Sequence, residues 1–227
     1  MNTQKNDQNS KSKDSINPFL LLFLATGVFL VAVAAFYQLF SGLQQRDRDS
    51  IAIVTSGDYT GASNDPPIQV TDFIATSSIG NEISLSDFKG HYVLMFFGYT
   101  HCPDVCPTTL AEFRKVKEEL GEDANYVTFL FISVDAPRDT PEIVETYVTR
   151  FDPEFVGISA DDKTLSRVGS ELGLFYDRLT DERRGENYLV DHTARSFLLS
   201  PERELIMSFA YGTDAEIIAN GIHRFIG

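Results

Sequence analysis

The sequence contains no tryptophan and few basic residues, and it shows no internal repeat or long low-complexity tract. Lysine and arginine number 19 against 33 aspartates and glutamates, which gives a net charge of −14. A surface of this sign repels phosphate backbones and anionic headgroups, which disfavours nucleic acid as a partner. The charge fits attraction to cations or basic partners, or a role in solubility alone. With 43% hydrophobic residues, 18 Phe and 9 Tyr, the 227-residue chain can still bury one sizeable core.

A long uncharged stretch lies near the N-terminus. No charged residue occurs from Ser15 to Gln45, and residues 19–40 are almost entirely apolar. As a helix, this segment would be roughly 33 Å long, enough to cross a bilayer. We therefore expect a cytoplasmic tail at 1–18, a retained transmembrane anchor at 19–40, a linker at 41–67 and one folded domain at 68–227. Lysines before the span and arginines after it place the domain on the far side of the membrane.

The rest of the chain alternates between strand and helix patterns. Continuous apolar runs at 92–97 and 126–134 predict central strands that are buried on both faces. Between them, apolar residues recur at helical spacing, at Leu110, Phe113, Val116 and Leu120. Later segments are expected as a helix ending near 150, a strand at 155–158, a helix at 161–172, extended segments at 188–190, 196–199 and 205–210, and a helix at 214–225. The alternation predicts an α/β fold, a sheet covered by helices with an antiparallel hairpin near its end.

Cys102 and Cys106 are the only cysteines, and both lie where the first central strand leads into the first helix. Ligands gather at this end of the strands in open α/β sheets, and the free N–H groups of a helix start favour thiolate over thiol. A disulfide between them would close a loop of three residues and gain little stability. About one helical turn apart, the two sulfurs can instead bind one metal ion.

A third ligand is expected from the four histidines, because imidazole binds both copper and zinc. His91 opens a strand, His223 lies on the last helix, and His101 should point away from Cys102 if the backbone is extended there. His192, just before a late strand, remains. Asp191 either orients the imidazole of His192 or caps the turn.

The donor set favours copper over zinc. Two thiolates and an imidazole suit three-coordinate Cu(I) and, with extra ligands, Cu(II). A structural zinc site needs a fourth protein ligand, and no third cysteine exists to supply it.

A second motif runs from Asp135 to Pro141. Asp139 followed by Glu142 has the pattern of a helix capping box, and Arg138 can join a surface ion pair. These roles explain the motif without a part in the metal site.

Three segments together resemble the Sco/SenC family of copper chaperones: Gly98 to Pro107, Val134 to Pro141, and Asp191 to Thr193, all behind one membrane anchor. The resemblance covers about residues 68–227. It implies a thioredoxin-like fold that binds Cu(I) and Cu(II), one copper per chain, through the two cysteines and His192. It also implies a role in delivering copper to, or maturing, the binuclear copper centre of cytochrome c oxidase.

The resemblance further implies two partners, the copper-bearing oxidase subunit and a copper donor. The expected location is a bacterial inner membrane with the domain in the periplasm; the alternative is the mitochondrial inner membrane. The tail carries Asp7 and Asp14, which a transit peptide lacks, so the bacterial location is preferred.

Two alternatives to a copper chaperone remain open. A thiol-disulfide reductase would use the same cysteine pair to keep the oxidase's copper-ligand cysteines reduced. Thioredoxins, however, space their cysteines by two residues and place a proline where this chain has the segment Asp191 to Thr193. A peroxidase is disfavoured because no threonine lies three residues before Cys102.

Overall fold

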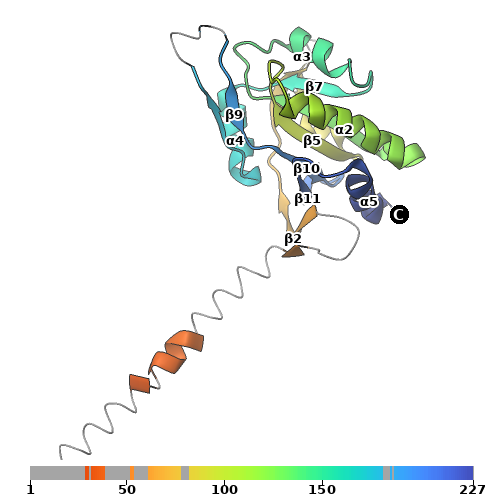
Figure 1. The fold of residues 1–227 in the computed structure, drawn as a ribbon. Coiled ribbons are helices and arrows are strands. Elements are labelled where there is room, and N and C mark those ends of the chain that lie inside the picture. Colours follow the sequence, from red (N-terminus) through yellow and green to blue (C-terminus); the bar gives the residue numbers. More distant parts are fainter. Residues whose placement is uncertain are drawn as a thin grey trace, which may run out of the picture. The chain divides into compact units, whose positions relative to one another are not determined.

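The computed structural model describes residues 29–30, 32–38, 52–53, 61–77, 82–180, 185 and 187–226 (Figure 1). The chain divides into two compact units, Met1–Asp49 and Ser50–Gly227. In the first unit, residues 29–30 and 32–38 are helical; the rest of the expected span and the expected tail lie outside the described residues. Within the described ranges, no helix combines the length and apolarity needed to cross a bilayer.

The second unit is built on a mixed sheet. Within the described residues, nine strands pair in the order β1-β2-β11-β10-β5-β6-β7-β3-β4. Their bounds are β1 Ala52–Ile53, β2 Gly61–Gln69, β3 Ile74–Ser77, β4 Glu82–Ser84, β5 Tyr92–Gly98, β6 Val127–Ser133, β7 Val156–Ser159, β10 Arg195–Leu199 and β11 Glu204–Ala210. The β5–β6 and β6–β7 pairs are parallel, and the other pairs are antiparallel. Outside this sheet, β8 (Tyr176–Arg178) and β9 (Val190–His192) form an antiparallel pair of their own.

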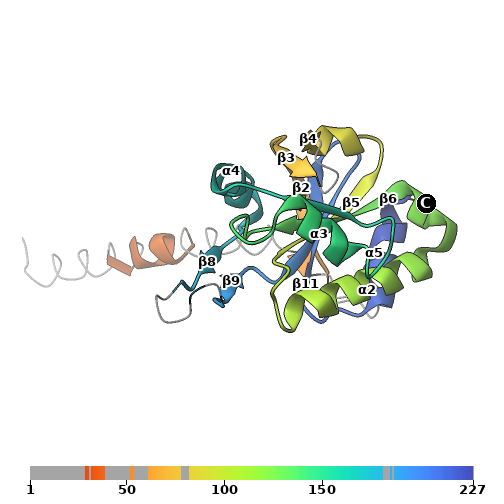
Figure 2. The same cartoon turned by 90° about the horizontal axis from the view of Figure 1, so that it is seen from above.

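Four helices complete the described part of this unit: α2 Val105–Leu120, α3 Pro141–Val148, α4 Asp162–Leu172 and α5 Ala215–Ile226. Short 3-10 turns occupy Leu85–Phe88 and Gly121–Tyr126. Helices α2 and α5 pack against each other (Figures 1 and 2). The expected helical stripe on α2 is confirmed, because Leu110, Phe113, Val116 and Leu120 are all buried.

The two apolar runs form the centre of the sheet, as predicted. Every residue of β5 after Tyr92 is buried, and six of the seven residues of β6 are buried. Phe96, Phe97 and Phe131 fill the core between sheet and helices, with at most 1% of each exposed. Because both faces of these strands are covered, neither shows the alternation of a half-exposed strand.

Residues 61–67, which the sequence assigns to a linker, form most of β2. Gly61 to Ser63 and Ile68 to Gln69 pair with β11, and the register shifts between these two stretches. Pro66 and Pro67, the residues that favoured a linker, fall in that interruption, where their missing N–H groups cost no ladder hydrogen bond.

The expected capping box at Asp139 is wrong. Thr140 is the N-cap of α3, its side chain accepts the N–H of Ile143, and Pro141 occupies the first helical turn. The carboxylate of Asp139 therefore has other partners.

Candidate metal centre

Cys106 lies in the first turn of α2 and is fully buried. Its sulfur packs against the end of β5, where a Cβ on Gly98 would come within 2.8 Å of both Cys106 Sγ and the Phe131 ring. Gly98 is therefore required by close approach, and the apolar core fixes the position of this sulfur.

Cys102 lies in the loop between β5 and α2 and is half-buried. Its sulfur accepts a hydrogen bond from the backbone N–H of Cys106 at 3.4 Å. A hydrogen bond from the Cys106 side chain, helped by His192 and by backbone N–H groups, lowers the pKa of Cys102 to about 3. Burial, followed by the neighbouring Cys102, raises the pKa of Cys106. These opposite pKa shifts favour a half-buried thiolate at Cys102 and a buried thiol at Cys106.

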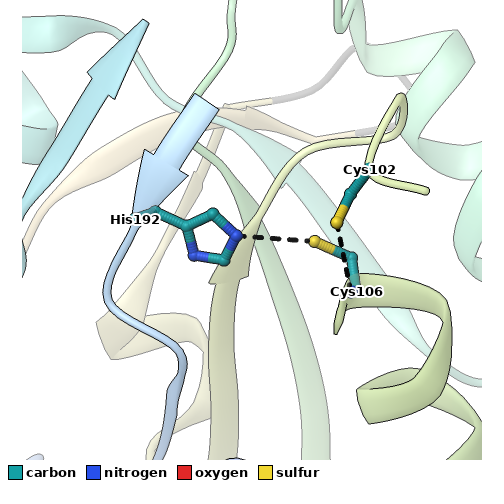
Figure 3. Close-up of side chains that lie close together, drawn as sticks. All are labelled: Cys102, Cys106 and His192. Carbon is teal, nitrogen blue, oxygen red and sulfur yellow. Dashed lines mark hydrogen bonds between the residues drawn. The ribbon is translucent and has the colours of Figure 1, made fainter. Parts of the chain in front are cut away.

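His192 is the last residue of β9, and its Nε2 lies 3.6 Å from Cys106 Sγ (Figure 3). The ring stands edge-on to Phe96 and Tyr99, with centroid distances of 5.7 and 5.9 Å. These aromatic contacts hold the imidazole plane beside the end of β5.

The second ring nitrogen of His192 faces a backbone carbonyl. His192 Nδ1 lies 3.2 Å from Thr193 O, so an Nδ1–H donated there leaves the Nε2 lone pair directed at the cysteines. The Thr193 carbonyl is therefore the group that orients the imidazole. The side chain of Asp191, the expected alternative, is exposed.

Cys102, Cys106 and His192 therefore converge. One ligand atom from each lies within 4.8 Å of the others, and within the described ranges no other group of three or more Cys, His, Asp or Glu side chains does so (Figure 3). His101 is outside this group, as expected: its Nδ1 lies 3.1 Å from Thr100 Oγ1, and its side chain is half-exposed. The structure brings the three expected residues together, and their role as metal ligands stays a prediction.

A buried charge cluster holds the β8–β9 pair to the end of β6. Asp135 is fully buried; it accepts hydrogen bonds from Arg138 Nε and from the Tyr188 hydroxyl, each at 2.6 Å. The Arg138 guanidinium lies 3.5 Å above the Tyr188 ring, and Arg178 of β8 donates to Val134 O at 2.6 Å. The cluster places β9, and therefore His192, next to the cysteines.

The sequence alone did not reveal this cluster. The expected surface ion pair of Arg138 is wrong, because the Arg138 side chain is only 10% exposed and its partner Asp135 is fully buried. The motif from Asp135 to Pro141 was the available signal, but its partner Tyr188 lies 53 residues further along the chain.

Comparisons with a family description and with individual proteins point to the same family. The family description SCO1/SenC matches residues 61–227. The SCO2-like protein of Rickettsia prowazekii is 32% identical over 138 residues, which are 60% of this chain and 67% of that protein. The mitochondrial SCO1 homolog of Homo sapiens is 33% identical over 145 residues, or 63% of this chain and 48% of the human protein. The chain thus spans about half the length of the human relative.

Solved structures agree in fold. ScoI of Bradyrhizobium japonicum, solved with copper bound, is 34% identical with a TM-score of 0.62 over 69% of this chain and 99% of that chain. Apo Sco1 of Thermus thermophilus is also 34% identical, with a TM-score of 0.66 over 75% of this chain and 98% of that chain. The fold is thioredoxin-like, as predicted, with helices covering a mixed sheet. This chain belongs to the SCO1/SenC family.

Proposed function

We propose that this chain binds one copper ion through Cys102, Cys106 and His192. The observation that carries the proposal is the convergence of two sulfurs and one imidazole nitrogen within 4.8 Å, on three separate segments of the fold. Soft thiolates suit Cu(I), and the imidazole adds a donor that Cu(II) prefers. The copper-bound state of the similar ScoI from Bradyrhizobium japonicum supports the same metal here.

The biological role that follows is delivery of copper to the binuclear centre of cytochrome c oxidase, or maturation of that centre. The site suits transfer because its ligands differ in exposure: Cys106 is buried, whereas Cys102 and His192 are partly exposed. A ligand from the copper-bearing oxidase subunit, or from a copper donor, can therefore approach at Cys102 while Cys106 still holds the ion. The family resemblance supplies the identity of these partners.

The proposal includes a tail at 1–18, a membrane anchor at 19–40 and a linker after it, shorter than the expected 41–67 because Ala52–Ile53 and 61–67 belong to β1 and β2. The uncharged stretch from Ser15 to Gln45 supports it. The domain then lies in the periplasm or, in a mitochondrion, on the outer side of the inner membrane. After an alkaline wash, the full-length chain should stay with the membrane pellet; its release at full length would contradict the anchor.

Copper binding is tested on the reduced full-length chain in detergent. We expect one Cu(I) per chain after removal of excess metal, and none in the double variant Cys102→Ser, Cys106→Ser. The same loading with zinc is expected to leave less than one ion per chain after competition with a chelator. Stoichiometric copper in the double variant, or a preference for zinc, would overturn the proposal.

A second candidate function, thiol-disulfide reduction, is favoured by the unequal exposure of the two cysteines. The partly exposed Cys102 thiolate would attack a disulfide in the partner and form a mixed disulfide, releasing one partner thiolate. Cys106, on losing its proton, would then displace the second partner thiolate. The products are a reduced partner and a Cys102–Cys106 disulfide, which is a two-electron transfer. Under this mechanism Cys106→Ser traps the mixed disulfide and Cys102→Ser does not.

A further inference from the structure

Asp139 is a fully buried carboxylate next to the metal centre. Its Oδ2 accepts hydrogen bonds from the Thr100 backbone N–H at 2.8 Å and from Ser133 Oγ at 2.6 Å. Its Oδ1 accepts a third from Thr100 Oγ1 at 2.6 Å. Three donors converge on one carboxyl group that has no exposure to solvent, so this group is held in a single orientation.

The three donors come from two segments that meet at the end of the sheet. Ser133 is the last residue of β6, and it pairs with Gly98, the last residue of β5. Thr100 follows Gly98 by two residues and precedes Cys102 by two. Asp139 therefore ties the loop that carries Cys102 to the end of β6.

Of the three candidate ligands, Cys102 depends most on a loop for its position. Cys106 belongs to α2 and His192 to β9, whereas Cys102 lies outside any helix or strand. Its own backbone N–H donates to Tyr99 O at 3.3 Å, which closes a turn around Thr100. The position of the Cys102 sulfur is thus set by the turn that Asp139 holds in place.

We propose that Asp139 is a positioning residue for the metal centre, acting through Thr100 to fix Cys102 where it can share an ion with Cys106 and His192. This inference rests on the proposed copper binding. Removing the carboxylate leaves the partly buried N–H and hydroxyl of Thr100 without their acceptor, so the loop is expected to move. The two sulfurs then no longer meet the ion in one geometry.

The contribution of geometry can be separated from that of charge. In Asp139→Asn, the amide oxygen can replace Oδ2, and the amide N–H can donate to Thr100 Oγ1, so the loop stays anchored without the charge. In Asp139→Ala, all three hydrogen bonds are lost. A control away from the metal centre is Asp161→Ala, which removes an exposed aspartate that caps α4 by accepting the Thr164 N–H.

The test is Cu(II) affinity, measured by chelator competition on the full-length chain, with the absorption band of the copper–thiolate bond recorded in parallel. We expect Asp139→Ala to weaken binding by roughly 10- to 100-fold and to shift the band, and Asp139→Asn to stay within about threefold of the parent. Asp161→Ala should lower the melting temperature of the metal-free chain and leave affinity and band unchanged. Copper affinity and band in Asp139→Ala equal to the parent's would overturn the proposal.

Thr100→Val keeps the test decisive if Asp139→Ala does not fold. This variant removes the hydroxyl that donates to Asp139 and that also lies 3.1 Å from His101 Nδ1, and Thr100→Ser restores it. We expect a loss of affinity of about threefold to tenfold for valine and recovery with serine. Parent-like binding by Thr100→Val would contradict the positioning role. A parent chain that binds no copper would refute the proposed function instead, so the two failures are distinguishable.

Discussion

The two sides of the metal centre are built in different ways. On the cysteine side, Cys106 packs against Gly98 and Phe131 in an apolar core between a parallel pair of strands and α2. On the histidine side, His192 belongs to a two-stranded sheet outside the main one, which is held by hydrogen bonds and charges around Asp135. Apolar packing positions Cys106, and a polar cluster positions the strand that carries His192.

This difference predicts that substitutions on the cysteine side and on the histidine side have different effects on stability and on copper binding. Core packing contributes strongly to folding, so changes near Cys106 should affect both the fold and the metal. The β8–β9 pair adds less buried apolar surface, and Phe175, Leu179 and Leu189 near it are 63%, 37% and 44% exposed. Changes there should weaken Cu(II) binding more than Cu(I) binding, because Cu(II) is the ion that needs the imidazole.

The largest expected effect on stability is that of Gly98→Ala. The new Cβ would meet Cys106 Sγ and Phe131 at 2.8 Å, inside a core that cannot easily move. We expect a loss of about 3 kcal/mol in the free energy of unfolding and weaker binding of both Cu(I) and Cu(II). Urea unfolding of the metal-free chain and chelator competition measure these two effects.

Gly157→Ala is the matched control, because its Cβ would meet Val144 Cγ1 at 2.6 Å, between β7 and α3. It should cost comparable stability without a change in copper affinity. If Gly98→Ala instead folds and binds copper like the parent, the packing account of the cysteine side is wrong.

On the histidine side, Tyr188→Phe removes the hydroxyl that donates to buried Asp135 at 2.6 Å. A hydrogen bond to a charged group supports a loss of about 2 kcal/mol in unfolding free energy. Cu(II) affinity should fall by about tenfold, because β9 loses a tie to the core. Calorimetry and copper competition give both values.

Tyr92→Phe serves as its control, since the Tyr92 hydroxyl donates to Phe225 O at 2.7 Å, at the end of α5. This variant should lose stability and keep its copper affinity. A Tyr188→Phe chain that binds Cu(II) as tightly as the control would show that the cluster does not position His192.

His192→Ala should change stability least among these substitutions, by about 1 kcal/mol or less, because the side chain is only partly buried. Its effect on Cu(II) affinity should exceed its effect on Cu(I) affinity, since two thiolates alone can hold Cu(I). Competition against a chelator for each ion, with thermal melts of the metal-free forms, separates the effects. Equal retention of Cu(II) by variant and parent would remove His192 from the site.

The difference in pKa between Cys102 and Cys106 is tested by alkylation of the reduced, metal-free chain, an experiment that involves no change in stability. With a pKa of about 3, Cys102 stays a thiolate throughout the range from about pH 5 to 8. The rate of its reaction with iodoacetamide should be nearly constant in this range. The rate of an ordinary thiol falls about tenfold for each unit by which the pH is lowered below its pKa. Cys106 should react slowly at every pH, because burial raises its pKa. Equal alkylation rates for both cysteines, each decreasing as the pH is lowered, would contradict the difference in pKa.

Local sequence patterns predicted the strands and helices in which an apolar run or a regular apolar spacing extends over the whole element. The apolar runs became β5 and β6, and the segments at 161–172 and 214–225 became α4 and α5 within one or two residues. β2 was missed because Pro66 and Pro67 obscured a strand whose pairing is interrupted at those prolines. β8 was missed because three residues carry no detectable period.

The candidate site shows the same division. The identities of Cys102, Cys106 and His192 could be proposed from donor chemistry and motif order, and the structure shows that they converge. The supporting residues could not be proposed. Asp139 fits a capping box locally, but its carboxylate instead accepts hydrogen bonds from Ser133, six residues before it, and from Thr100, 39 residues before it. Asp135 likewise depends on Tyr188, and a single sequence does not reveal such a pair.

The central claim is that one copper ion is shared by two thiolates and one imidazole. X-ray absorption at the copper edge of the loaded full-length chain, compared with His192→Ala, tests it directly. We predict two sulfur donors in both proteins, with imidazole scattering in the parent that disappears from the variant. Imidazole scattering that persists in His192→Ala, or a parent spectrum with fewer than two sulfur donors, would contradict the assignment of Cys102, Cys106 and His192 as the ligands.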